Sequence, residues 1–159
     1  MRTVEASVVW QTKMRFTGTG NRSGFSVALD SPADEGEFQG ASPMEMLLIA
    51  LGGCTGMDVV SILGKMRQDV TAYEIRVRGE RAAEHPKVYT DIEVEHIVTG
   101  RKLDPANVEK AIRLSETKYC SVSNTLAKAA NVRFTYRIVD EDQKPNALAS
   151  VKRPAARPR

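Results

Sequence analysis

One long apolar stretch, residues 42–67, constrains the fold more than any other part of this sequence. It begins with a capping box, because Ser42 and Glu45 flank a proline that suits the first helical turn. No charged residue occurs between positions 46 and 57, and a helix that is apolar all round is normally buried inside a domain or against a partner. The stretch therefore predicts a long buried helix around which the other elements are arranged.

The remaining sequence alternates between strand-like and helix-like patterns. Strand-like segments occupy residues 3–10, 12–17, 25–30, 70–82, 88–100 and 132–139, with a glycine-rich turn at 18–24. Helix-like segments occupy residues 105–118 and 122–130, with Asp104 and Ser121 as their predicted caps. The two longest strands alternate apolar with charged residues, as in an antiparallel sheet covered on one face, with charge pairs across the strands. This order predicts an α+β fold in which antiparallel sheets wrap around the central helix.

The distribution of charge separates a body from a tail. Residues 1–140 are electrically neutral and form one predicted domain, whereas residues 141–159 carry the whole net charge of +3 and are predicted to be a disordered basic tail. A neutral body argues against a nucleic-acid partner. The uncharged run at 46–57 is too short to span a bilayer, and no export signal is visible. We therefore expect a cytoplasmic protein without a membrane contact.

The two cysteines are the residues with the clearest chemical potential. A structural disulfide between Cys54 and Cys120 is not expected in a reducing compartment, which leaves inert burial or transient redox chemistry. Cys54 lies about 16 Å along the helix at ~1.5 Å per residue, beyond the reach of the helix dipole. A thiolate there needs a cation from another segment, for which Arg22 in the glycine-rich turn is the first candidate and Arg15 the second. Cys120 lies at a junction between helices, where it could meet an oxidised Cys54 as a resolving thiol.

Other polar residues are less suited to catalysis. Asp58 follows Cys54 by one helical turn on the same face, and a carboxylate there would oppose thiolate formation unless it is itself paired. Asp58 therefore either lies next to the site or caps a buried polar group. The two cysteines with His85 and His96 are spaced unlike any familiar zinc set, so we expect no metal and no bound cofactor. The sequence also lacks a glycine-rich phosphate loop after a strand and a nucleophilic serine motif.

The segments around both cysteines resemble the OsmC/Ohr family of thiol-dependent hydroperoxide reductases. The motif S-P-M-E-x-L-L-x-A-L-G-G-C ends at Cys54, Y-C-S-V-S-N-x-L contains Cys120, and the resemblance covers residues 1–139. It implies an intertwined homodimer with two active sites between the subunits. It also implies that Cys54 attacks the peroxide and becomes a sulfenic acid, that Cys120 condenses with it to a disulfide, and that a dithiol, typically a lipoyl group, reduces the disulfide.

The resemblance also assigns an arginine and a glutamate, and the glutamate departs from the family pattern. The family's loop arginine corresponds to Arg22. In the best-known members the glutamate directly follows the proline, a place taken here by Met44, so Glu45 is one residue late. At ~100° per residue, Glu45 and Cys54 lie about 180° apart on an ideal helix. Glu45 therefore either serves the site of the other subunit or only caps the helix.

The predicted function is reduction of organic hydroperoxides with a dithiol or a lipoylated protein as reductant. Two alternatives stay open. The fold could serve as a binding module that holds a small apolar molecule at the dimer interface, which the displaced Glu45 favours. The two thiols could also exchange with disulfides without any peroxide chemistry.

Overall fold

The computed structural model describes residues 3–31 and 38–143, which form a mixed α+β fold with two small sheets. Most of the tail predicted to be disordered lies outside the described residues. The chain divides into two compact units, Met1–Ala50 and Leu51–Arg159. The elements are β1 (Ala6–Thr12), β2 (Arg15–Gly20), β3 (Ser26–Leu29), α1 (Pro43–Lys65), β4 (Asp69–Arg81), β5 (Tyr89–Arg101), α2 (Pro105–Leu114), the π-helical turn η1 (Ser115–Tyr119), α3 (Ser121–Leu126), β6 (Asn131–Asp140) and the 3-10 turn η2 (Glu141–Gln143).

The first unit contains an antiparallel meander in the order β1-β2-β3. The turn predicted at residues 18–24 begins later than expected, because β2 continues through Gly20. Gly18 pairs with Val27 inside the sheet, and a Cβ on it would meet the side chains of Val27 and Leu29 at 3.7 Å. The turn between β1 and β2 instead contains Lys13 at a positive φ of 49°. The predicted turn is therefore confirmed only for residues 21–24, where Gly24 has a positive φ of 72°, whereas Gly18 and Gly20 belong to β2.

The predicted capping box at the start of α1 is confirmed. The Ser42 backbone N–H donates to Glu45 Oε2 at 2.8 Å, and the Glu45 N–H donates to Ser42 Oγ at 3.2 Å. These bonds satisfy two backbone donors that the first turn of a helix would otherwise leave without partners.

Within the second unit, one face of α1 is buried and the opposite face is open. Leu51, Thr55, Val59 and Leu63 recur every four residues and are fully buried, as one helix face requires. Met57 and Val60 remain 77% and 51% exposed. A single chain therefore buries only one face of α1, whereas the sequence predicted a helix that is buried on all sides. By length and composition α1 is also apolar enough to cross a bilayer, a test that core helices of soluble proteins pass too.

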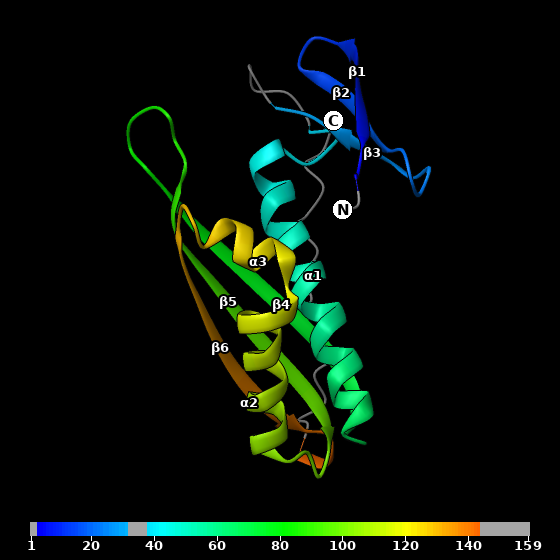
Figure 1. Ribbon diagram of the computed structural model, residues 1–159, viewed down its shortest axis with the longest axis vertical. Coiled ribbons are helices and arrows are strands. Elements are labelled where there is room, and N and C mark those ends of the chain that lie inside the picture. The colour runs from blue at the N-terminus through cyan, green and yellow to red at the C-terminus, as the bar shows by residue number, and fades with distance from the viewer. Residues whose placement is uncertain (1–2, 32–37, 144–159) are drawn as a thin grey trace, which may run out of the picture. The chain divides into compact units, whose positions relative to one another are not determined.

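The second sheet, in the order β4-β5-β6, differs from the purely antiparallel prediction. Strands β4 and β5 are antiparallel, with Ile75 opposite His96, but β6 runs parallel to β5, with Val94 opposite Phe134. The cause is the crossover from β5 through α2, η1 and α3, which returns the chain to the end where β5 begins. Figure 1 shows α1 and α2 on the same face of this sheet. The core between these layers consists of Val59, Leu63, Val98, Val108, Ala111 and Ile112.

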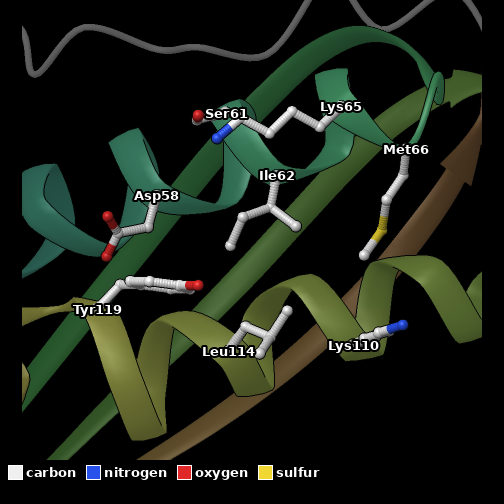
Figure 2. A pocket seen from close by; sticks show the side chains of 8 residues that line it. All are labelled: Asp58, Ser61, Ile62, Lys65, Met66, Lys110, Leu114 and Tyr119. Atoms are coloured by element: carbon white, nitrogen blue, oxygen red, sulfur yellow. The ribbon is translucent and has the colours of Figure 1, made fainter.

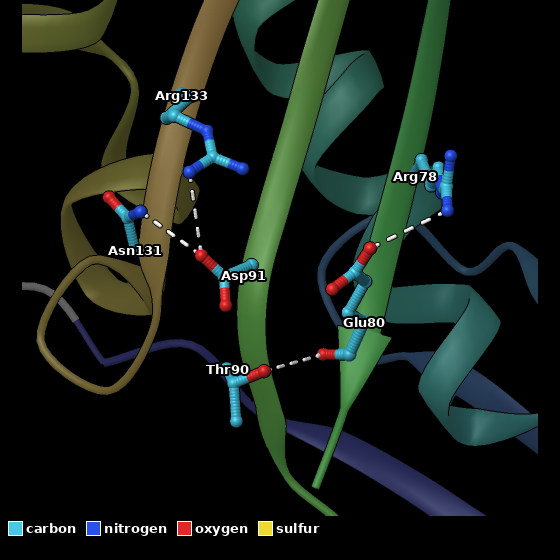
Figure 3. A network of polar contacts seen from close by, with 6 residues as sticks. All are labelled: Arg78, Glu80, Thr90, Asp91, Asn131 and Arg133. Carbon is cyan, nitrogen blue, oxygen red and sulfur yellow. Dashed lines mark hydrogen bonds and ion pairs between the residues drawn. The ribbon is translucent and has the colours of Figure 1, made fainter.

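The charge pairs predicted across the two longest strands form only in part, since Arg101 of β5 pairs with the opposite Asp69 of β4 at 3.5 Å. Arg76 lies opposite Glu95 in the register, but it forms its 2.7 Å ion pair with Glu74 of its own strand. Glu95 pairs at 3.0 Å with Arg137 of β6. Figure 3 shows another polar network of this sheet, formed by Arg78, Glu80, Thr90, Asp91, Asn131 and Arg133. Such exposed pairs contribute at most about 1 kcal/mol each, so the core beneath them stabilises the sheet.

Gly79 of β4 allows the ring of Tyr89 to lie across the strand. A Cβ on Gly79 would approach the ring carbon Cδ1 to 2.6 Å. We expect Gly79→Ala to lower the free energy of unfolding by about 2 kcal/mol, because the ring must leave its place. Urea unfolding measures this. The same substitution in a Tyr89→Leu background should cost much less, and an equal cost in both backgrounds would show that the ring is not the obstacle.

Candidate active site

Three side chains of the second unit form a compact cluster around two sulfur atoms. Helix α1 presents Cys54 and Asp58 one turn apart, hence on the same face. The Sγ atoms of Cys54 and Cys120 and a carboxylate oxygen of Asp58 all lie within 4.8 Å of one another. The fold therefore brings together two cysteines that are far apart in the sequence, and adds Asp58. Among the described residues, His85 and His96 are not part of this cluster.

A π-helical turn positions Cys120. Helix α2 ends at Leu114, and the next turn widens so that the Cys120 N–H donates to the Ser115 carbonyl at 2.9 Å. Single π-turns of this kind occur frequently at functional sites. Cys120 is itself the N-cap of α3, since its Sγ accepts from the Ser123 N–H at 3.3 Å. The prediction that Ser121 caps this helix is therefore wrong, because Ser121 is already its first residue.

Two buried hydroxyl groups hold the Asp58 carboxylate in place. Ser115 Oγ donates to Asp58 Oδ2 at 3.0 Å. Because that bond uses the only hydroxyl hydrogen of Ser115, Thr55 Oγ1 must donate to Ser115 Oγ across their 2.9 Å contact. Thr55 and Ser115 are both fully buried. One feature of the sequence indicates these hydrogen bonds, because Ser115 lies on the otherwise apolar face of the predicted helix 105–118.

The two thiols differ in accessibility. Cys54 is half-buried, whereas Cys120 is fully buried. Burial is the main cause that raises the pKa of Cys120 to about 12; the Ser123 N–H opposes this rise, and Cys54 and Asp58 add to it. Cys120 is therefore a protonated thiol at neutral pH, and Cys54 is the sulfur that a reactant from solvent meets first.

A pocket of about 460 Å³ lies beside the cluster, between α1 and the α2–η1 segment. Figure 2 shows its lining residues, which are Asp58, Ser61, Ile62, Lys65, Met66, Lys110, Leu114 and Tyr119. Asp58 belongs to both the pocket and the cluster. The lining combines apolar side chains with two ammonium groups, so the pocket can accept an organic molecule near the two sulfurs.

The other predicted site residues belong to the first unit. Arg22 is exposed in the turn between β2 and β3, and Arg15 forms a 3.5 Å ion pair with Asp30. Hydrogen bonds from Ser42 lower the pKa of Glu45, in keeping with its capping role. Neither unit by itself holds both Arg22 and Cys54, so activation of Cys54 by Arg22 stays a prediction, as does a catalytic role for Glu45.

Comparison with known proteins points to one family. The model of the OsmC-like protein family matches residues 34–135. Protein YhfA of Escherichia coli (strain K12) is 43% identical over 136 residues, which cover 86% of this chain and 98% of YhfA. The crystal structure of a hypothetical protein from Aquifex aeolicus VF5 has a TM-score of 0.79 and 29% identity, covering 89% of this chain and 99% of that one. The organic hydroperoxide resistance protein OhrB of Bacillus subtilis has a TM-score of 0.59 at 14% identity, covering 86% and 98%, which shows a shared fold.

Proposed function

The chain belongs to the OsmC-like protein family, and from this premise we propose that it is a thiol-based peroxidase that reduces organic hydroperoxides. The observation that carries the proposal is the approach of the Cys54 and Cys120 sulfurs to within 4.8 Å. Some solved structures with the same fold are organic hydroperoxide resistance proteins, which supports the same chemistry.

The proposed cycle uses the two sulfurs in turn. The Cys54 thiolate attacks one oxygen of the O–O bond, the bond breaks, and the remaining alkoxide leaves as an alcohol after taking a proton. Cys54 is then a sulfenic acid. The Cys120 sulfur attacks the Cys54 sulfur and loses its proton, the hydroxyl group leaves as water, and a disulfide forms. A dithiol reduces this disulfide by exchange and is itself oxidised.

The proposed activation of Cys54 comes from Arg22. A cation is required because the carboxylate of Asp58 lies within 4.8 Å of Cys54 Sγ, and a like charge at this distance opposes a thiolate. In this proposal Arg22 acts on Cys54 of its own subunit or of a partner subunit. Glu45 acts at the same site if it has a role beyond capping the helix. The exposed Met57 and Val60 on α1 support a homodimer, since a second copy would cover this apolar face.

We further propose a cytoplasmic enzyme without a bound cofactor, for which a small dithiol or a lipoylated protein is the reductant. The substrate is an organic hydroperoxide whose carbon chain enters the pocket beside Asp58, where Ile62, Leu114 and Tyr119 provide apolar contacts.

The proposal is tested by the stoichiometry of one turnover and by the variant Cys120→Ser. In the wild-type protein, one equivalent of cumene hydroperoxide should oxidise both thiols of a chain and join Cys54 to Cys120. In Cys120→Ser the first equivalent should still react, but the product should be a sulfenic acid at Cys54 that dimedone traps, because the resolving sulfur is missing. Mass spectrometry of the two peptides measures both results. Loss of only one thiol in the wild-type protein would contradict the assigned roles.

One observation favours a second function, the binding of a small molecule. The mixed pocket could hold an organic ligand without any reaction at the thiols. That function predicts ligand-dependent thermal stabilisation in a protein whose thiols do not react with hydroperoxides. Reaction of Cys54 with an equivalent of hydroperoxide decides against it.

A further inference from the structure

We propose that the reduced protein binds one Zn²⁺ ion through the sulfurs of Cys54 and Cys120 and the carboxylate of Asp58. The bound ion occupies both thiols and thereby blocks their oxidation. Zinc binding itself does not depend on the proposed peroxidase activity, whereas inhibition by zinc rests on it.

The geometry of the cluster suits a single tetrahedral ion. Zinc binds thiolate sulfur at about 2.3 Å and carboxylate oxygen at about 2.1 Å. Two sulfurs on one tetrahedral zinc are therefore about 3.8 Å apart, and sulfur and oxygen about 3.6 Å apart. The three ligand atoms already lie within 4.8 Å of one another, so movements on the order of 1 Å bring them to these distances. The fourth position is left for water, as in open zinc sites.

A second layer of hydrogen bonds orients two of the three ligands. Ser115 Oγ donates to Asp58 Oδ2 at 3.0 Å and is supported by Thr55, and the Ser123 N–H donates to Cys120 Sγ at 3.3 Å. Bonds of this kind fix ligating groups and stabilise their negative charge. Thr55 and Ser115 are fully buried and Ser123 is 3% exposed, so water does not compete for these bonds.

The ligand set suits zinc better than magnesium or calcium. Two thiolates do not suit magnesium or calcium, which take oxygen ligands. One carboxylate with two thiolates suits the borderline-soft Zn²⁺. Both sulfurs bind as thiolates, so any proton that they carry passes to solvent, and the ion balances the negative charge of the three side chains.

Zinc and oxidation exclude each other at this cluster. A disulfide between Cys54 and Cys120 leaves neither sulfur as a thiolate, so Asp58 is the one ligand of this cluster that remains in the oxidised chain. Conversely, a thiolate that donates a lone pair to zinc carries less negative charge, so it is a weaker nucleophile toward a peroxide. The cluster thus links the redox state of the protein to its metal content.

The experiment uses the full chain without a polyhistidine tag, reduced and freed of metal. Zinc affinity is measured by competition with a chromogenic chelator, and Co²⁺ serves as a spectroscopic probe of sulfur ligation. We expect one ion per chain, a sulfur-to-cobalt charge-transfer band, and protection of the more accessible Cys54 thiol from maleimide. Asp58→Asn, which keeps an oxygen to accept from Ser115, should weaken binding by at least about tenfold, and Cys120→Ser by more. Glu109→Gln, an exposed carboxyl on α2, is the matched control and should leave the affinity unchanged.

The outcomes separate this inference from the proposed function. Zinc affinity that is unchanged in Asp58→Asn or in Cys120→Ser overturns the site, and so does equal binding by the disulfide form. These measurements involve no hydroperoxide, so a protein without peroxidase activity can still confirm the site. An active peroxidase that binds no zinc in the reduced state overturns the zinc site and leaves the proposed function intact.

Discussion

Cys54→Ser is expected to lower the rate of hydroperoxide reduction by about 1000-fold or more, to the level of the uncatalysed reaction with the dithiol. The step requires an atom that attacks the O–O bond and accepts oxygen, which a thiolate does and a serine hydroxyl does not. Cys120 cannot take over this step, because it is fully buried and burial raises its pKa to about 12. Consumption of cumene hydroperoxide with excess dithiol measures the rate.

Comparison with Cys120→Ser makes this result specific. Both variants replace sulfur by oxygen in the same cluster, so a general disturbance of the fold should affect them alike. Only Cys120→Ser should retain the first turnover. Thermal unfolding of each variant checks that the fold is kept. Unchanged turnover in Cys54→Ser would end the peroxidase proposal.

The sequence predicted those parts of the fold that depend on local patterns. The capping box of Ser42 and Glu45, the long apolar helix and the order of elements follow from side-chain type and spacing, and all are present. The direction of β6 was missed because alternation says nothing about which end of a sheet a strand enters. That direction is set by the crossover through α2 and α3.

The site could be predicted as a pair of sulfurs but not as a cluster. The motifs around Cys54 and Cys120 identified both cysteines, and their approach required the fold. The spacing of Asp58 from Cys54 predicted that it could lie next to the site, but not which groups it would contact there. The reason for its place is the hydroxyl chain from Thr55 through Ser115, two residues 60 positions apart. No local pattern contains a contact of that kind.

His96 lies in an environment that its position in the sequence does not predict. It is fully buried on β5, with its ring between Tyr73 and Phe134 at centroid distances of 5.9 and 5.8 Å. Its Nδ1 is hydrogen-bonded to the Tyr73 hydroxyl, and its Nε2 has no hydrogen-bond partner among the described residues. Burial raises the pKa of Tyr73 above its ordinary value, so that the hydroxyl stays neutral and brings no charge to the imidazole.

The protein is therefore expected to lose about 3 kcal/mol of its free energy of unfolding as the pH falls from 6.5 to 4, through His96 alone. Burial lowers the pKa of His96 from 6.5 to about 4 in the folded chain. Between these values the unfolded chain binds the proton and the folded chain does not, so protonation favours unfolding. The contribution is complete above pH 6.5 and is lost progressively below it. Urea unfolding at a series of pH values measures the slope.

A variant that cannot titrate separates His96 from the carboxyl groups, which also destabilise folded proteins in acid. His96→Gln retains an amide that can bond to the Tyr73 hydroxyl, so the loss of stability at neutral pH should be moderate. Its free energy of unfolding should change much less between pH 6.5 and 5, a window above the ordinary pKa of carboxyl groups. An equal slope in the wild-type protein and in His96→Gln over that window would mean that His96 is protonated in the folded chain. The buried imidazole would then have to be reached by water or paired with an acid.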